Sequence, residues 1–233
     1  MHLVVDYRGR ELTGIVRPGE SWASAARRTA AMIQGSDPIP VDLSGEVKRF
    51  AVDHDTVVSV RAATRGDLPD LVRWRQAAHV LKWWVSDGEP TKERVEEQYG
   101  PDLDGMTPTR MWIGEVNGRS VGFIQDYRIS DYPEFAQLAP DPAAIGVDYA
   151  IGDPVFIGRG LGVRLVWEWM ERAHRRFPDA RAIFAAPDHR NEPSLRLLDK
   201  LGYVRGTWFD QPLADGSVST VVGCTLDVPT VLG

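Results

Sequence analysis

The sequence contains a single cysteine, Cys224, so no disulfide can form within the chain. Disulfides are typical of oxidising compartments, and their absence leads us to expect a reducing, cytoplasmic location. No run of apolar residues approaches the roughly 18 that a membrane-spanning helix needs. The N-terminus has no basic patch followed by an apolar stretch, which is the pattern of a secretion signal. We therefore predict no association with membranes.

Basic residues are outnumbered by acidic ones: 27 Lys and Arg stand against 33 Asp and Glu, a net charge of −6. Binding to nucleic acid usually needs a basic face, so we expect none. The histidines show no metal-ligand spacing with one another or with the cysteine, and we propose no metal site. The remaining composition, 43% hydrophobic and 26% charged over 233 residues, is that of an ordinary globular protein.

The pattern of apolar and turn residues divides the chain near Thr56. We predict a small N-terminal α/β appendage over 1–55 and a main domain over 56–233. Strands are expected at 2–7, 11–17, 56–62, 110–116, 120–129, 145–151, 181–185, 203–211 and 218–226. Helices are expected at 21–33, 64–79, 91–99, 160–177 and 192–201, with a loop at 35–44. This order indicates a layered α/β fold whose sheet is mixed but mostly antiparallel.

A glycine-rich run, Gly158-Arg159-Gly160-Leu161-Gly162, lies between an expected strand and a long expected helix. Glycines at alternate positions let backbone N–H groups approach an anion, and the start of a helix carries about half a positive charge. Together they favour phosphate binding, although a tight turn would need the same residues. The spacing matches neither a P-loop nor a dinucleotide fingerprint.

This run resembles the pyrophosphate-binding loop of the GNAT acyltransferases. A second likeness supports it, because Asn191 opens a helix that is followed by Gly202-Tyr203, as in that family. The resemblance extends over roughly 56–226. It implies a GNAT fold, acetyl-CoA as co-substrate, and a small-molecule amine as acceptor. It leaves the oligomeric state open.

Within the family, the nearest likeness is to aminoglycoside 6′-N-acetyltransferases. The stretches that carry it include Trp83-Trp84, Gln125 with Tyr127, and Gly146-Val147-Asp148. The resemblance implies that the two Trp residues, Gln125, Tyr127 and Asp148 contact the acceptor. The segment 187–191 is instead similar to siderophore-type lysine N-acyltransferases.

Acetyl transfer requires that the amine lose a proton, and Asp148 on the strand before the glycine run is our first candidate for the base. It has an alternative role in holding a substrate ammonium. Asp188 is the second candidate, and its alternative is a turn residue that bonds its own backbone. The resemblance to GNAT enzymes implies that a backbone N–H of Tyr149 or Ala150, on the strand that carries the base, stabilises the oxyanion.

Other positions have both a functional and a structural interpretation. The resemblance implies that Asn191 and Ser194 face the coenzyme, whereas a helix N-cap and an exposed first-turn serine are the alternatives. Trp83 and Trp84 would stack against sugar rings, or one of them would fill the core. An acidic segment is expected beside the acceptor site, or in a solvated loop. Its members are Glu115, Asp126, Asp131, Glu134, Asp141, Asp148 and Asp153.

Two residues depart from the family pattern. Ile157 stands where Gln or Arg is usual, and Leu198 stands where many members have a tyrosine that protonates the leaving thiolate. The sequence therefore supports an aminoglycoside-type acetyltransferase first and a siderophore-type acyltransferase second. Leu198 keeps a third possibility open, a module that binds acyl-CoA or a drug without turnover.

Overall fold

The computed structural model describes residues 1–33, 37–85, 88–133, 141–213 and 215–233. The strands are β1 (His2–Tyr7), β2 (Arg10–Ile15), β3 (Ile39–Asp42), β4 (Val47–Ala51), β5 (Val58–Ala62), β6 (Arg110–Val116), β7 (Arg119–Arg128), β8 (Ile145–Ile151), β9 (Ala182–Ala185), β10 (Val204–Pro212) and β11 (Val218–Asp227). The α-helices are α1 (Trp22–Ala30), α2 (Leu68–Arg75), α3 (Ala78–Leu81), α4 (Lys92–Leu103), α6 (Leu161–Arg176), α7 (Glu192–Lys200) and α8 (Val228–Val231). Within the described residues, no helix is both long and apolar enough to cross a membrane.

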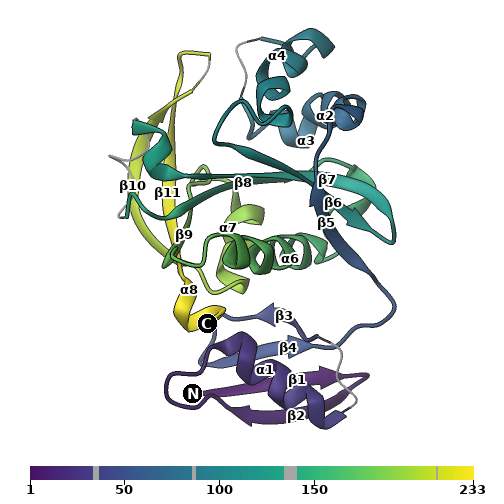
Figure 1. Ribbon diagram of the computed structural model, residues 1–233, viewed down its shortest axis with the longest axis vertical. Coiled ribbons are helices and arrows are strands. Elements are labelled where there is room, and N and C mark those ends of the chain that lie inside the picture. The colour runs from purple at the N-terminus through teal and green to yellow at the C-terminus, as the bar shows by residue number, and fades with distance from the viewer. Residues whose placement is uncertain (34–36, 86–87, 134–140, 214) are drawn as a thin grey trace.

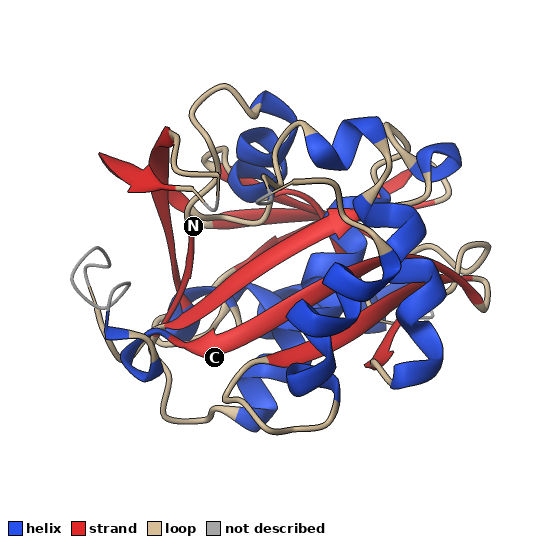
Figure 2. Cartoon of the chain, turned by 90° about the horizontal axis from the view of Figure 1, so that it is seen from above, coloured by secondary structure: helices blue, strands red, loops and turns tan. Residues whose placement is uncertain are grey.

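The strands form two sheets, one of seven strands in the order β10-β11-β9-β8-β7-β6-β5 and one of four in the order β2-β1-β4-β3. Neighbours run antiparallel except for the β8–β9 and β1–β4 pairs. Helices α2–α4 lie on one face of the large sheet, and α6 and α7 lie between the other face and the small sheet (Figure 1). The view turned by 90° shows helices crossing over strands, as stacked layers require (Figure 2). The predicted mixed, mostly antiparallel α/β fold is confirmed.

The N-terminal part contains more strands than the sequence pattern predicts. The expected loop over 35–44 is wrong in its second half, because Ile39–Asp42 forms β3 and pairs with the unpredicted β4. Gly35, the first residue of that loop, lies outside the described residues. β3 is only four residues long and includes Pro40, so its pairing partner and the helices beneath it decide its conformation, not its own propensity.

A single core joins the N-terminal part to the main domain. The ring of Phe50 on β4 packs edge-on against Trp167 of α6, with ring centroids 6.1 Å apart. Trp22 of α1 lies so close to Gly202 that a Cβ there would come within 2.8 Å of the indole. Phe50 and Trp22 belong to the same buried cluster as Leu198 and Leu201 of the α7 region. The appendage therefore buries the outer surfaces of α6 and α7.

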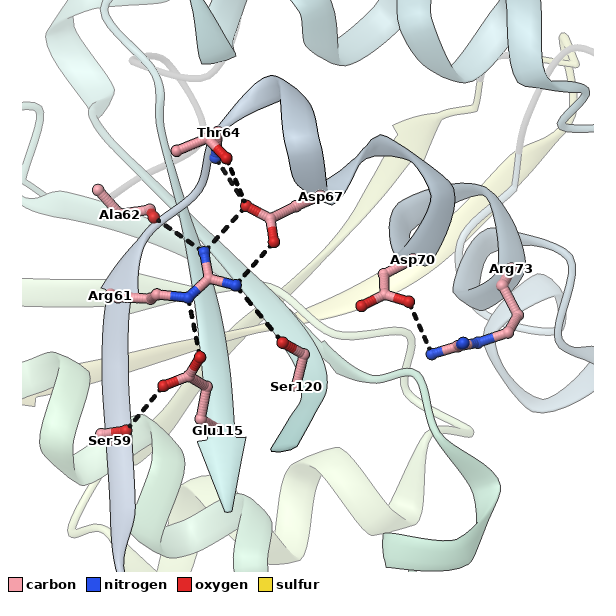
Figure 3. A network of polar contacts seen from close by, with 9 residues as sticks. All are labelled: Ser59, Arg61, Ala62, Thr64, Asp67, Asp70, Arg73, Glu115 and Ser120. Carbon is pink, nitrogen blue, oxygen red and sulfur yellow. Dashed lines mark hydrogen bonds and ion pairs between the residues drawn. The ribbon is translucent and has the colours of Figure 1, made fainter. Parts of the chain in front are cut away.

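The predicted helix over 64–79 is divided in two. A short 3₁₀ turn leads into α2, and the extended backbone of Ala77 (φ −68°, ψ 129°) separates α2 from α3. Thr64 and Asp67 form a capping box. Asp67 also receives two hydrogen bonds from Arg61 of β5, 2.7 and 2.9 Å long, and the same guanidinium bonds Glu115 of β6 at 2.8 Å (Figure 3). This network fixes the start of α2 on the edge of the large sheet.

Candidate active site

The large sheet is split between β8 and β9. The two strands are registered only through Ile145 with Ile183 and Gly146 with Phe184, after which they diverge. A cleft of about 440 Å³ occupies the divergence. Its walls come from the α3 end, α4, β7, β8, the β9–α7 connection and the β10–β11 hairpin. A parallel pair that separates in this way opens the interior of the sheet to a ligand without disturbing the outer strands.

The cleft is reached from both faces of the sheet. Asp148 lies on the α2–α4 face, where its carboxylate accepts a hydrogen bond of 3.1 Å from Gln125 of β7. Tyr149, the next residue, points to the opposite face, where its hydroxyl lies 2.8 Å from the Ser194 hydroxyl of α7. Alternating residues of a strand point to opposite faces, yet both of these line the same cleft. The split therefore connects the two sides of the sheet.

Asp148 is half-buried and lines the cleft. Burial raises the pKa of its carboxyl above the ordinary value, and hydrogen bonds from Gln125 and Tyr127 partly offset that rise. Gly146 makes the second of these bonds possible, because a Cβ there would lie 2.5 Å from the Tyr127 ring. A carboxylate with a raised pKa is a stronger base than an ordinary aspartate.

Asp188 has a different environment. It bonds Arg190 through both carboxylate oxygens, at 2.9 and 2.7 Å, and accepts a 2.6 Å hydrogen bond from Ser219. Its Oδ1 also accepts the backbone N–H of Arg190, the turn contact expected of a Pro-Asp sequence. These bonds, with that of Arg190 first, lower the pKa of Asp188 well below its usual range. The geometry therefore favours Asp148 over Asp188 as a base.

The two adjacent tryptophans have different packing. Trp84 tilts onto Phe123 at a centroid distance of 4.9 Å and lies 5.4 Å from the guanidinium of the buried Arg75. Trp83 packs against the ammonium group of Lys82 at 4.5 Å. Both indoles are half-buried and both line the cleft. Packing and ligand contact are thus compatible for Trp84, whereas Trp83 has the freer ring.

Asn191 and Ser194 also line the cleft. The Asn191 side chain accepts the backbone N–H of Ser194 at 3.3 Å and caps α7, which confirms the N-cap interpretation. Ser194 is half-buried, so the alternative of an exposed first-turn serine is wrong. A cap that is also part of the cleft wall fixes the position of the helix start relative to any ligand there.

The glycine-rich run lies at the start of α6 and outside the cleft walls. Gly158 and Gly160 have left-handed backbones (φ 75° and 73°) with open space around them, and no side chain caps the helix. The first-turn N–H groups are therefore free to meet an anion.

The other residues of the glycine-rich run have different environments. Gly162 serves packing instead, because a Cβ there would lie 2.6 Å from Leu197 of α7. Leu161 is buried, and Arg159 is exposed beside the Phe156 ring.

The structure brings together most of the predicted site residues. Those that line the cleft are Trp83, Trp84, Gln125, Asp148, Asp188, Asn191 and Ser194. Tyr127 lines an adjoining cavity of about 50 Å³ that shares Asp148. Lys82, Gln98 and Arg190 also line the cleft, although the sequence analysis assigned none of the three a role in the site. No spacing pattern singles out these three, because they come from separate elements.

Most described members of the acidic segment do not line the cleft, against the expectation that the segment lies beside the acceptor site. Asp148 alone of those acidic residues lines the cleft. Glu115 pairs with Arg61, Asp153 pairs with Arg119, and Asp126 is buried on the α6 face beneath two indole N–H groups. Glu134 lies outside the described residues. Likewise, no group of three or more His, Cys, Asp or Glu side chains in the described ranges is arranged to hold a metal ion.

Comparison with known proteins gives three consistent findings. A family model described as an acetyltransferase (GNAT) domain matches residues 63–211. The aminoglycoside N(6′)-acetyltransferase type 1 of Klebsiella pneumoniae is 28% identical over 150 residues, which cover 64% of this chain and 74% of that protein. The lysine N-acyltransferase MbtK of Mycolicibacterium paratuberculosis is 26% identical over 162 residues, 69% of this chain and 72% of that one.

Solved structures are similar over the same region. The aminoglycoside acetyltransferase AAC(6′)-Ib in complex with coenzyme A superposes with a TM-score of 0.63 at 26% identity, covering 73% of this chain and 95% of that one. A second structure of the same protein, with coenzyme A and kanamycin, gives the same values. Residues 1–62 precede the family match.

Proposed function

This chain belongs to the GNAT acetyltransferase family, and from that premise we propose that its acceptor is an amino group of an aminoglycoside-like amino sugar. The chain is an acyl-CoA-dependent N-acetyltransferase with the GNAT fold, and acetyl-CoA is its co-substrate. The observation that supports the acceptor proposal best is the half-buried Asp148, which lines the same cleft as the two indoles of Trp83 and Trp84. Indole faces suit sugar rings, and the carboxylate suits an amine.

The residues of the cleft have distinct roles in this proposal. Asp148 accepts a proton from the attacking amine, either directly or through a water molecule, and such a base contributes roughly 10²–10⁴-fold to the rate. Gln125 and Tyr127 hold its carboxylate in place through hydrogen bonds. Trp83 and Trp84 orient the acceptor against the cleft wall. Asp188 stays bound to Arg190 and shapes the opposite wall rather than taking a proton.

The coenzyme-binding proposal rests on the start of α6 and on α7. Gly158 and Gly160 leave uncapped N–H groups open to a pyrophosphate, and the residues present there fit such a group. Arg159 adds a positive charge, while Leu161 and Gly162 contribute backbone N–H groups from the first turn. Asn191 and Ser194 then line the path from α6 toward Asp148.

A panel of amines tests the acceptor class. We would measure thiol release from acetyl-CoA with aminoglycosides, simple polyamines, monoamines and free lysine derivatives, each at two ionic strengths. Amino sugars should be the preferred acceptors, and their KM should rise with salt because charge attraction is screened. Since the cleft residues described carry two positive and two negative side chains, the salt effect should be modest. A preference for monoamines over every amino sugar would refute the acceptor proposal.

A lysine N-acyltransferase is the second candidate, and the cationic rim of the cleft favours it. Lys82 and Arg190 both line the cleft, and both are exposed. Arg190 is already paired with Asp188, so it is Lys82 that suits an acceptor with a carboxylate near its amine, as lysine derivatives have. Replacing Lys82 by Glu should then weaken the binding of an acceptor that carries a carboxylate and strengthen the binding of an oligocationic acceptor. For the acceptor that the wild type prefers, a higher KM in Lys82→Glu would support the lysine N-acyltransferase, and a lower KM would support the aminoglycoside-like acceptor.

A further inference from the structure

Two hydroxyl groups face each other on the α7 side of the split. The Tyr149 and Ser194 hydroxyl oxygens are 2.8 Å apart, and both residues line the cleft. In such a pair one hydroxyl donates to the other, so one proton always remains available for a further acceptor. The proposed base, Asp148, is on the other side of the same strand and faces Gln125. The split sheet therefore has a proton acceptor on one face and a spare donor on the other.

No other side chain near this pair, among the residues that the structure describes, offers a free hydroxyl to the cleft. Leu198 is apolar and fully buried, so it provides no donor. The Tyr203 hydroxyl is buried without a hydrogen-bond partner, and Tyr203 is not among the residues that line the cleft. Ser219 does line the cleft, but its hydroxyl donates to Asp188. Among the described residues on the α7 side, Tyr149 and Ser194 are thus the hydroxyls best placed to meet a ligand.

The two sides of the split receive different reactants. The uncapped start of α6 lies on the same side of the sheet as α7, so a phosphate held there brings the thioester in from the Tyr149 side (Figure 1). The amine approaches from the Asp148 side, where Trp84 and Gln98 form the wall. The sulfur, which departs away from the attacking amine, then lies next to the hydroxyl pair.

We propose that the Tyr149–Ser194 pair is a catalytic element that donates a hydrogen bond to the sulfur as it leaves. This inference rests on the proposed acetyl transfer, but it holds for any amine acceptor. The C–N bond forms, the C–S bond breaks with its electron pair moving to sulfur, and the amine proton goes to Asp148. Sulfur departs as a thiolate that accepts the hydrogen bond, and Asp148 later returns its proton to solvent.

The pair acts as a hydrogen-bond donor rather than as an acid. Burial raises the pKa of the Tyr149 hydroxyl well above its ordinary value, with the bond to Ser194 lowering it in part. A phenol of this kind keeps its proton at neutral pH. Thiols are much stronger acids than alcohols, as the pKa of about 8.5 for a cysteine thiol illustrates, so a thiolate can leave with hydrogen-bond assistance alone.

The first test needs no acceptor. Coenzyme A would be bound to the protein and its thiol titrated through the ultraviolet absorbance of the thiolate, with tyrosine ionisation subtracted using coenzyme-free protein. Tyr149→Phe should raise the thiol pKa by about one unit, the size expected for losing one hydrogen bond to an anion. Ser194→Ala should raise it too, and the double variant should add little, because the two hydroxyls act as one unit.

Tyr203→Phe is the matched control, since it removes a buried hydroxyl that neither has a partner nor lines the cleft. It should leave the thiol pKa unchanged. Calorimetric titration of coenzyme A checks that each variant folds and binds. If Tyr149→Phe and Ser194→Ala both bind coenzyme A as the wild type does and both leave the thiol pKa unchanged, the proposal is overturned.

The second test uses the best amine from the panel. Tyr149→Phe should lower kcat by roughly tenfold, corresponding to about 1.4 kcal/mol, with the acceptor KM unchanged. With an aryl thioacetate as donor, whose thiolate is far less basic, the defect should nearly vanish. An equal defect with both donors would contradict a role at sulfur. If the wild-type protein acetylates no amino sugar, the acceptor proposal is refuted. The thiol titration still tests the Tyr149–Ser194 proposal, because it needs no acceptor.

Discussion

Asp148 and Tyr149 are consecutive residues of β8 that point to opposite faces of the sheet and still line one cleft. This is possible because β8 and β9 separate after two registered pairs. In an unbroken sheet the two side chains would be shielded from each other by the neighbouring strand. The split thus brings side chains from opposite faces of the sheet to one cleft.

The first prediction concerns Asp148. Asp148→Asn keeps the size of the side chain but removes its negative charge, and we expect kcat/KM to fall by roughly 10²-fold or more. If the carboxylate is a base, kcat falls; if it only holds the ammonium, KM rises and kcat is spared. Asp188→Asn should cost less, because its carboxylate is already bound to Arg190. Steady-state kinetics with an unchanged kcat and KM in Asp148→Asn would exclude both roles.

The second prediction concerns pH. A base works only when deprotonated, so kcat/KM should rise with pH through the pKa of Asp148, which burial raises above its ordinary value. The Tyr127 hydrogen bond stabilises the carboxylate, and Tyr127→Phe should therefore move this acidic limb to higher pH. Tyr132→Phe is the control, because its hydroxyl contacts Thr109. If the acidic limb of the profile of kcat/KM against pH does not move in Tyr127→Phe, Asp148 does not control that limb.

Much of the main domain could be predicted from local pattern. The Asn117-Gly118 turn has both residues at positive φ, as a tight hairpin requires, and the amphipathic pattern over 160–177 matches α6. The break at Ala77 and strand β3 were not predicted, because neither contains a strong local signal. Their conformations depend on packing, of α3 beside the cleft and of β3 against α6 and α7.

The site was predicted only in part, because some of its contacts depend on packing rather than on local sequence pattern. Trp83, Trp84 and Asp148 were identified through a family resemblance, and the structure brings them to one cleft. The Tyr149–Ser194 contact joins residues 45 positions apart and depends on where β8 leaves β9, so no spacing rule finds it. The acidic segment contributes only Asp148 to the cleft, because charge in a sequence does not tell which carboxylates are buried or paired elsewhere, as the burial of Asp126 shows.

The third prediction concerns the start of α6. Gly160→Asp places a carboxylate next to N–H groups that we propose for the pyrophosphate, so acetyl-CoA affinity should fall strongly while the fold is kept. Gly160→Ala imposes the same left-handed backbone on a residue with a Cβ but adds no charge. It should weaken binding much less. Calorimetric titration compares the two variants, and equal affinity losses would indicate a purely conformational effect.

The fourth prediction concerns the appendage, which we propose as a structural support for α6 and α7. Phe50 is only 1% exposed and packs on Trp167, so Phe50→Ala should lower the free energy of unfolding by about 3–5 kcal/mol. Met32→Ala, at a side chain that is 75% exposed, should change it little. Because the core is shared, denaturant unfolding followed by fluorescence and by circular dichroism should give one coincident transition. Two separated transitions would mean that residues 1–55 unfold independently.

The last prediction concerns the Arg61 network in Figure 3. Hydrogen bonding to Arg61 is the largest effect that lowers the pKa of the buried Asp67, despite an opposing contribution from burial. Asp67→Asn should reduce the free energy of unfolding at neutral pH by about 1–3 kcal/mol, the value for hydrogen bonds to a charged group. Partial exposure of Arg61 favours the lower end of that range.

The pH dependence identifies the source of this stability. A carboxylate whose pKa is depressed in the folded state contributes stability above its unfolded pKa of about 3.9, and that contribution is lost as pH falls through the folded value. The difference between wild type and Asp67→Asn should therefore be constant near neutrality and shrink below about pH 4. Asp70→Asn removes the more exposed pair with Arg73 in the same region and should cost under about 1 kcal/mol. A difference for Asp67→Asn that does not change with pH would mean that its capping of the helix start, and not its charge, stabilises the fold.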